Sequence, residues 1–301
     1  MMIAGVLAHA EPMVEDNAIG VIGGSGLYEL EGLEDIERTE LDTPFGAPSD
    51  AFISGRLDDQ RMVFLPRHGH GHRLLPSEIP FLANIWGMKK LGVNRLVSVS
   101  AVGSLQEHLA PGDMVLVDQF IDRTKGRPQT FFGQGLVVHV PFAEPVCPTL
   151  RRRLLDASTS IDATVHDGGT YVCIEGPQFS TKAESHLYRS WGADVIGMTN
   201  LPEAKLAREA EMSYATVALV TDYDCWHETE EEVTVEAILA VLRANVTRAK
   251  KLLEALVALP FGEETSELAR TATRTSMITA PEAIPEEVRR DLDPILGAFL
   301  K

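Results

Sequence analysis

The stretch A-I-G-V-I-G-G-S-G, residues 18–26, joins a short apolar β-rich run to a glycine-rich turn. Runs of the same kind recur along the chain, each bounded by turn residues, as buried strands usually are. They cover Ala18–Gly23, Met62–Leu65, Leu96–Val99, Met114–Val117, Tyr171–Ile174, Val195–Met198 and Ala215–Val220. We therefore expect these runs to be strands of a buried sheet.

Helical patterns alternate with several of these runs, because apolar residues recur there at spacings of three and four. The expected helices cover Pro76–Leu91, Thr149–Ser158, Thr181–Trp191, Leu201–Glu211 and Glu231–Ala258. Strands that alternate with helices are typical of a three-layer α/β fold. The predicted architecture is therefore a central sheet flanked by helices.

The length and composition indicate one large core. The chain has 301 residues, of which 45% are hydrophobic, and this is enough to bury a substantial interior. We expect a loose N-terminal extension over residues 1–17, a single domain over residues 18–261 and a tail over residues 262–301. Within the tail, the weakly amphipathic stretch Pro285–Phe299 predicts a short helix.

Charge and cysteine content narrow the class of protein. The net charge of −17 disfavours nucleic acid and anionic membranes as partners, because no basic stripe offsets it. The 3 cysteines lie far apart and form no C-x-x-C pair, which argues against a disulfide framework or structural zinc. The sequence also lacks an apolar run long enough to span a bilayer and a basic signal-peptide region. We expect a cytoplasmic protein with a small ligand.

Two loops that follow predicted strands could bind an anion. The turn G-G-S-G, Gly23–Gly26, can direct backbone amides and the Ser25 hydroxyl at one point. A tight turn without a ligand explains its glycines equally well. The loop P-R-H-G-H-G-H, Pro66–His72, offers the forked donors of Arg67 and the imidazole of His68. Phosphate suits this loop better than a metal bound by its alternate histidines, and a solvated basic loop remains an alternative.

A third loop, S-V-S-A-V-G-S at Ser98–Ser104, ends an apolar strand and offers the hydroxyl of Ser100. Open α/β sheets bind ligands outside the carboxyl ends of their strands. Together the three loops predict one phosphate site formed by Ser25, Arg67, His68 and Ser100.

An acidic pair follows the last predicted strand. Asp222 and Asp224 stand two residues apart in V-T-D-Y-D-C-W, so that both carboxylates point the same way if the chain stays extended. In a dry pocket, a carboxyl group has a raised pKa and can supply a proton to a leaving base. A carboxylate that stays ionised can instead accept a hydrogen bond from an amino group. Two solvated loop aspartates are the alternative.

In this order, the motifs resemble the 5′-methylthioadenosine phosphorylase branch of the trimeric purine nucleoside phosphorylase family. The resemblance runs from about Ile19 to about Leu256. Longer matches carry it, namely D-T-P-F-G-A-P-S at Asp42–Ser49, D-Q-F-I-D-R-T at Asp118–Thr124, E-G-P-Q-F-S at Glu175–Ser180 and W-G-A-D-V-I-G-M-T at Trp191–Thr199. It implies a purine nucleoside phosphorylase-like fold with a twisted mixed sheet.

The resemblance also implies a role for each matched residue. The phosphate would be held by Ser25, Arg67, His68, Ser100 and the Ala101 amide, the ribose by Met198 and Thr199, and the purine by Phe179, Ser180, Asp222 and Asp224. Asp222 would face N7 of the purine and Asp224 its amino group. Relatives that prefer 6-oxopurines have asparagine where this chain has Asp222. Relatives in general often have threonine in place of Ser25 and Ser100, and serine keeps the hydroxyl.

A methylthio pocket is implied at the positions of His139, Val235, Ile238 and Leu239. An apolar wall suits a thioether. The spacing of the three aliphatic residues describes an ordinary core face equally well, and a structural hydrogen bond would also explain His139. In this family a neighbouring subunit closes part of each site, and His139 would belong to such a shared wall.

The implied activity is phosphorolysis of 5′-methylthioadenosine to adenine and 5-methylthioribose 1-phosphate, in methionine and purine salvage. Inorganic phosphate is then a co-substrate, and no metal or organic cofactor is implied. The expected assembly is a homotrimer. The alternatives are an inosine or guanosine phosphorylase, a hydrolase that uses water in place of phosphate, and a nucleoside sensor without activity.

Overall fold

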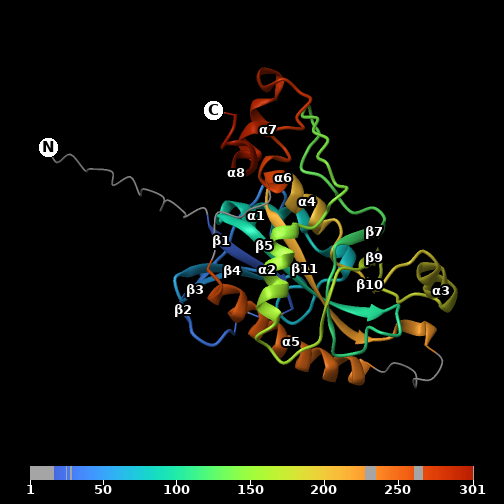
Figure 1. The fold of residues 1–301 in the computed structure, drawn as a ribbon. Helices are drawn as coiled ribbons and strands as arrows, with labels where there is room; N and C mark the ends of the chain where they lie inside the picture. Colours follow the sequence, from blue (N-terminus) through green and yellow to red (C-terminus); the bar gives the residue numbers. More distant parts are fainter. Residues whose placement is uncertain (1–16, 25, 28, 228–234, 261–266, 301) are drawn as a thin grey trace.

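The computed structural model describes residues 17–24, 26–27, 29–227, 235–260 and 267–300 (Figure 1). For residues 235–240, 242, 267 and 268 it describes the backbone. An 11-stranded mixed sheet forms the centre, with the strand order β2-β3-β4-β1-β5-β10-β9-β7, and β11, β6 and β8 branch from β5. The predicted α/β fold with a mixed sheet is confirmed.

Each predicted strand is present. They are β1 (Ala18–Gly23), β4 (Gln60–Pro66), β5 (Val93–Ser104), β6 (Met114–Leu116), β9 (Thr170–Ile174), β10 (Val195–Gly197) and β11 (Ser213–Asp222). β1 pairs in parallel with β4 and β5, and β5 pairs in parallel with β11, so that the carboxyl ends of these strands meet at one edge. β10 pairs with β5 in the antiparallel sense and with β9 in parallel.

Four strands were not predicted: β2 (Leu33–Thr39), β3 (Phe52–Leu57), β7 (Gln119–Arg123) and β8 (Val165–Asp167). Strand β2 has the sequence L-E-D-I-E-R-T, and its central residues are exposed. It pairs with β3 alone and ends the sheet. An edge strand needs few apolar residues, and charged side chains there protect the edge from pairing with other chains.

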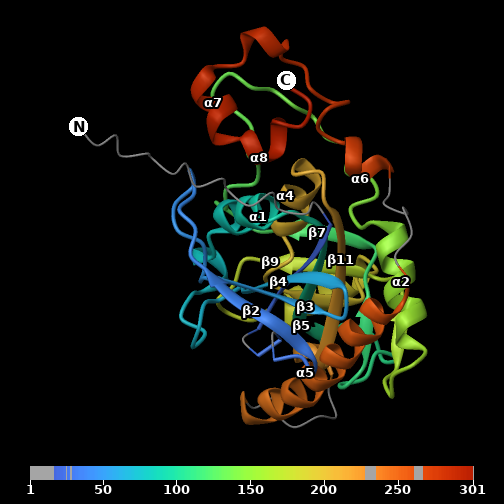
Figure 2. The same cartoon turned by 90° about the vertical axis from the view of Figure 1, so that its left-hand side faces the viewer.

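Helices cover both faces of the sheet (Figure 2). On one face lie α1 (Phe81–Lys90) and α4 (Glu203–Glu209), and on the other lie α2 (Pro148–Ser158) and α5 (Val235–Ala258). The alternation of β1 fits this arrangement, because Ala18 and Ile22 pack in the core beneath α1 whereas Ile19 and Val21 pack in the core beneath α2. Helix α3 (Lys182–Ser190) lies at the end of the sheet that holds β9 and β10.

The predicted helix over Pro76–Leu91 is divided in two. A 3-10 turn covers Pro76–Glu78, and α1 begins after Pro80, whose ring removes a backbone donor and restricts the preceding residue. The predicted helices at Thr149–Ser158, Thr181–Trp191, Leu201–Glu211 and Glu231–Ala258 correspond to α2, α3, α4 and α5. Residues 231–234 of the last one lie outside the described residues.

The C-terminal part forms α6 (Glu267–Thr271), a 3-10 turn (Pro281–Ala283), α7 (Glu286–Asp291) and α8 (Asp293–Leu296), beyond the end of the sheet near α1 (Figure 1). The predicted helix within Pro285–Phe299 is thus two short helices. Buried side chains of α7 and α8 join the core cluster that contains Phe131 and Leu136. Within the described ranges, no helix is both long and apolar enough to cross a membrane.

Candidate active site

A cavity of about 540 Å³ opens where the carboxyl ends of β1, β4, β5, β9 and β11 meet. Its lining contains most of the predicted site residues, namely Arg67, His68, Ser100, Ala101, Phe179, Ser180, Met198, Thr199, Asp222 and Asp224. Gly24 also lines it. The adjacent Ser25 lies outside the described residues, as do the side chains of Val235, Ile238 and Leu239, so their positions stay predictions.

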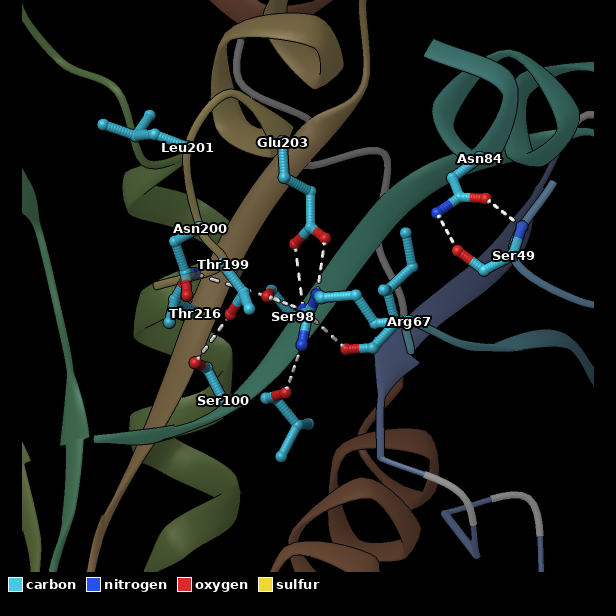
Figure 3. A network of polar contacts seen from close by, with 12 residues as sticks. Ser49, Arg67, Asn84, Ser98, Ser100, Thr199, Asn200, Leu201, Glu203 and Thr216 are labelled. Carbon is cyan, nitrogen blue, oxygen red and sulfur yellow. Dashed lines mark hydrogen bonds and ion pairs between the residues drawn. The ribbon is translucent and has the colours of Figure 1, made fainter. Parts of the chain in front are cut away.

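Arg67 directly follows β4 and is buried beneath the cavity. Its Nε and Nη2 donate to the two carboxylate oxygens of Glu203, at 2.8 and 3.1 Å, and Nη1 donates to the Val99 carbonyl at 3.0 Å (Figure 3). Nη2 also donates to Ser98 Oγ at 2.6 Å. Burial works to lower the pKa of Arg67, but the charge and hydrogen bonds of Glu203 leave that pKa raised. The guanidinium is therefore a fixed cation whose charge is balanced by Glu203.

His68 lies half-buried beside Arg67. Its Nδ1 is 2.8 Å from the Leu74 carbonyl, and its ring stacks on His72 with 4.2 Å between the ring centres. Burial lowers the pKa of His68 to about 4, so that the imidazole is neutral near neutral pH. Because Nδ1 must carry the proton that the Leu74 carbonyl accepts, Nε2 is left as an acceptor. Among the described residues, no group of three or more potential ligands could hold a metal ion.

Ser100 connects the anion side of the cavity with the side formed by β9 and β10. Its Oγ is 3.0 Å from Thr199 Oγ1 (Figure 3). The same oxygen is 3.3 Å from the Tyr171 hydroxyl. Thr199 follows β10, and both Ser100 and Thr199 are buried. A ligand held by Ser100 would therefore lie next to one held by Thr199.

Asp222 and Asp224 both reach the cavity, but the chain does not stay extended between them. Strand β11 ends at Asp222, and Asp224 has φ +51° and begins a 3-10 turn. Asp222 accepts hydrogen bonds from Thr221 Oγ1 at 2.7 Å and from the Asp224 amide at 2.8 Å. Burial raises the pKa of both carboxyl groups, and the charge of Asp222 contributes to the rise at Asp224.

Phe179 and Ser180 follow the E-G-P-Q segment at another wall of the cavity. The Phe179 side chain is 73% exposed in the single chain, which is unusual for a large apolar residue. The Ser180 hydroxyl is buried and has no hydrogen-bond partner among the described residues. Both groups are thus available to a ligand in the cavity.

His139 is the predicted residue that the structure places away from the others. It is exposed, it does not line the cavity, and its amide donates to the Ser276 carbonyl at 3.1 Å. Within one chain, His139 therefore belongs to the surface that packs on the C-terminal segment.

The structure adds residues that the sequence did not indicate. Glu203 stands in the first turn of α4, where an acidic residue usually serves the helix dipole, so nothing in the sequence connects it with Arg67. Arg73 lines the cavity and donates to the Ser49 carbonyl at 3.0 Å. Arg73 follows the R-H-G-H-G-H motif by one residue, and its proximity to that motif is the signal that could have found it.

Comparisons with known proteins agree with this geometry. A model of the phosphorylase superfamily matches residues 18–258. An S-methyl-5′-thioadenosine phosphorylase of Geobacter sulfurreducens is 57% identical over 95% of this chain and 100% of the relative. One from Synechocystis is 54% identical over 93% of this chain and 87% of the relative.

Solved structures agree as well. A methylthioadenosine phosphorylase from an antarctic soil metagenomic library superposes with a TM-score of 0.89 and 49% identity, over 94% of this chain and 100% of the other. An adenosine/methylthioadenosine phosphorylase mutant of Schistosoma mansoni in complex with adenine gives 0.83 and 38%, over 88% of this chain and 100% of the other. The chain belongs to the phosphorylase superfamily.

Proposed function

We propose that this protein cleaves 5′-methylthioadenosine with inorganic phosphate, giving adenine and 5-methylthioribose 1-phosphate in purine and methionine salvage. The observation that carries the proposal is the composition of one cavity. An anion-binding side with Arg67 and Ser100 lies next to a side with half-buried carboxyl groups, Asp222 and Asp224. The Ser100 to Thr199 contact joins the anion-binding side to the side formed by β9 and β10. A nucleoside bound in this cavity would have phosphate near its sugar and carboxyl groups near its purine.

In the proposed reaction, the C1′–N9 bond of the nucleoside breaks and a phosphate oxygen bonds to C1′. Asp222 in its acid form gives its proton to N7, so that adenine leaves as a neutral molecule, and the carboxylate then regains a proton from solvent. The raised pKa of Asp222 keeps this proton available closer to neutral pH than an exposed aspartate could. The protein itself need not form a covalent bond, because alignment and charge stabilisation supply the rate.

The buried Arg67 adds little net charge to the phosphate side, where Arg73 also lines the cavity. Glu203 neutralises Arg67, and His68 is neutral, so that its Nε2 can accept a hydrogen bond from a phosphate hydroxyl. We propose that the Ser100 hydroxyl and the Ala101 amide, with Ser25, donate the remaining hydrogen bonds. Neither a metal nor an organic cofactor has a role in this proposal.

Adenine is the preferred base in this proposal. Asp224 in its ionised form would accept a hydrogen bond from the 6-amino group, which hypoxanthine and guanine lack at that position. Val235, Ile238 and Leu239 are proposed to surround the methylthio group. His139 would act in the site of a neighbouring subunit, since its exposed position keeps it from the cavity of its own chain.

A cytoplasmic homotrimer is part of the proposal. Exposed apolar side chains support an interface, because Val137 is 46% and Ile278 69% exposed. Sedimentation equilibrium should give a mass of three chains. A monomer that turns over methylthioadenosine at full rate would contradict the shared site.

The test of the activity is adenine release from methylthioadenosine with and without phosphate. We expect release that depends on phosphate and saturates with it. Equal release in its absence would identify a hydrolase, and faster turnover of inosine would identify a 6-oxopurine phosphorylase. A protein that binds adenine but releases none from either nucleoside would be a sensor.

A further inference from the structure

A buried arginine outside the cavity connects two segments of its wall. Arg127 is 6% exposed, and its Nη1 donates to the carbonyls of Met198 and Leu201, both at 2.8 Å. Nη2 donates to the Glu175 carbonyl at 2.7 Å, and Nε donates to Glu175 Oε1 at 3.1 Å. One guanidinium thus holds the segment after β9 and the segment after β10 at a fixed separation.

These segments carry most of the proposed nucleoside contacts. Phe179 and Ser180 follow Glu175, whereas Met198 and Thr199 follow β10. The parallel pairing of β9 with β10 ends at the residues Cys173 and Gly197. Beyond that pair the backbone ladder no longer sets the distance between the segments, and the bonds of Arg127 begin there.

Arg127 is itself held rigidly. Its guanidinium lies 5.5 Å from the centre of the buried Phe81 ring. Lys205 Nζ bonds Asp122 Oδ2 at 2.5 Å and Gln129 Oε1 at 2.6 Å, which fixes both ends of the loop that carries Arg127. Because the fork binds several carbonyls at once, a lysine, with a single ammonium group, cannot reproduce the contacts.

We propose that Arg127 is a positioning residue for the nucleoside, acting through the Met198 and Glu175 backbones without touching substrate. The inference rests on the proposed function. Arg127 is not among the residues that line the cavity. Of the proposed phosphate residues, Arg67 directly follows β4 and is bonded to Glu203, and Ser100 is held by the register of β5 against β11. Loss of Arg127 should therefore weaken nucleoside binding much more than phosphate binding.

The test compares Arg127→Lys with the wild type in steady-state phosphorolysis, with each substrate varied in turn. We expect the KM for methylthioadenosine to rise about tenfold or more, as for a lost hydrogen bond from a charged group, and the KM for phosphate to change less than about threefold. Calorimetric titration with adenine should show a similar loss of affinity. Thermal unfolding of each variant is measured in parallel.

Arg95→Lys is the matched control. Arg95 is also 6% exposed and bonds Asn17 Oδ1 at 2.5 Å, but it lies near the amino end of β5, opposite Ile19 and Ser213. It should leave both KM values unchanged even if the unfolding temperature falls. If Arg127→Lys does not fold, Glu175→Gln, which keeps the carbonyl contacts, should raise the nucleoside KM alone by a smaller factor.

Equal rises in both KM values, or an unchanged nucleoside KM in a variant with a lowered unfolding temperature, would overturn the assignment. If the wild-type protein formed no adenine, that result would contradict the proposed function and not the role of Arg127. The two failures are therefore distinguishable.

Discussion

Replacing Glu203 by glutamine should show how much the Arg67–Glu203 ion pair beneath the phosphate side of the cavity stabilises the protein. The side chains of Arg67 and Glu203 are only 3% and 2% exposed, and the carboxylate also accepts a hydrogen bond from the Tyr214 hydroxyl at 2.9 Å. Glu203→Gln keeps the shape, but its amide NH₂ must face one of the two Arg67 donors, Nε–H or Nη2–H, that the carboxylate oxygens now accept. It leaves a buried guanidinium without its counter-charge.

Breaking a buried ion pair from one side typically costs about 3–5 kcal/mol, and this is the loss of unfolding free energy that we expect. Phosphate should recover part of it, because a bound dianion restores a negative charge beside Arg67. The stabilisation that saturating phosphate provides should thus be larger in Glu203→Gln than in the wild type.

Urea unfolding with and without phosphate measures both quantities. Glu211→Gln is the control, since Glu211 pairs with Arg274, which does not line the cavity. Its stability loss should be the same in both buffers. A loss below about 1 kcal/mol for Glu203→Gln, as for a surface pair, with no extra response to phosphate, would refute the reasoning.

Other variants test separate parts of the account. Burial raises the pKa of Glu209 to about 7, so the native state keeps a proton that the unfolded chain releases above its pKa of 4.5, and stability should fall as pH rises through this window. Glu209→Gln should remove that fall. Its free energy of unfolding should equal that of the wild type at about pH 4 and exceed it by about 3 kcal/mol at about pH 8. A variant whose stability depends on pH as the wild type does would contradict the raised pKa. Phe179→Ala should raise the KM for the nucleoside roughly tenfold, because the stacking contact is lost. It should lower the free energy of unfolding by less than about 0.5 kcal/mol, because the ring is exposed. An unaltered KM would show that Phe179 does not stack on the purine. Asp222→Asn should lower turnover of methylthioadenosine by about 10²-fold or more and favour 6-oxopurines relatively, which competition between inosine and methylthioadenosine would show; unchanged selectivity would mean that the purine contact lies elsewhere.

Sequence patterns were sufficient to predict the buried strands and most of the helices. Runs such as Ala18–Gly23 are apolar because both faces of β1 are covered. Strand β2 could not be predicted, because its exposed, charged side chains show no apolar alternation. The predicted helix over Pro76–Leu91 includes Pro80, and the structure divides it there because proline restricts the residue before it.

The site was predictable where its residues follow strands. Arg67, Ser100 and Asp222 meet because β4, β5 and β11 end at one edge of the sheet. The partnership of Arg67 with Glu203 spans 136 positions of sequence and depends on how α4 packs, which no local pattern records. Likewise, the place of Asp224 depends on a left-handed turn rather than on strand alternation.

The most direct test of the account follows the phosphorus atom. Purified protein is incubated with methylthioadenosine and inorganic phosphate, phosphorus NMR follows the phosphate, and chromatography quantifies adenine. We predict a new sugar 1-phosphate resonance that grows in equal amount with free adenine. Adenine that accumulates while inorganic phosphate stays unchanged would contradict phosphorolysis.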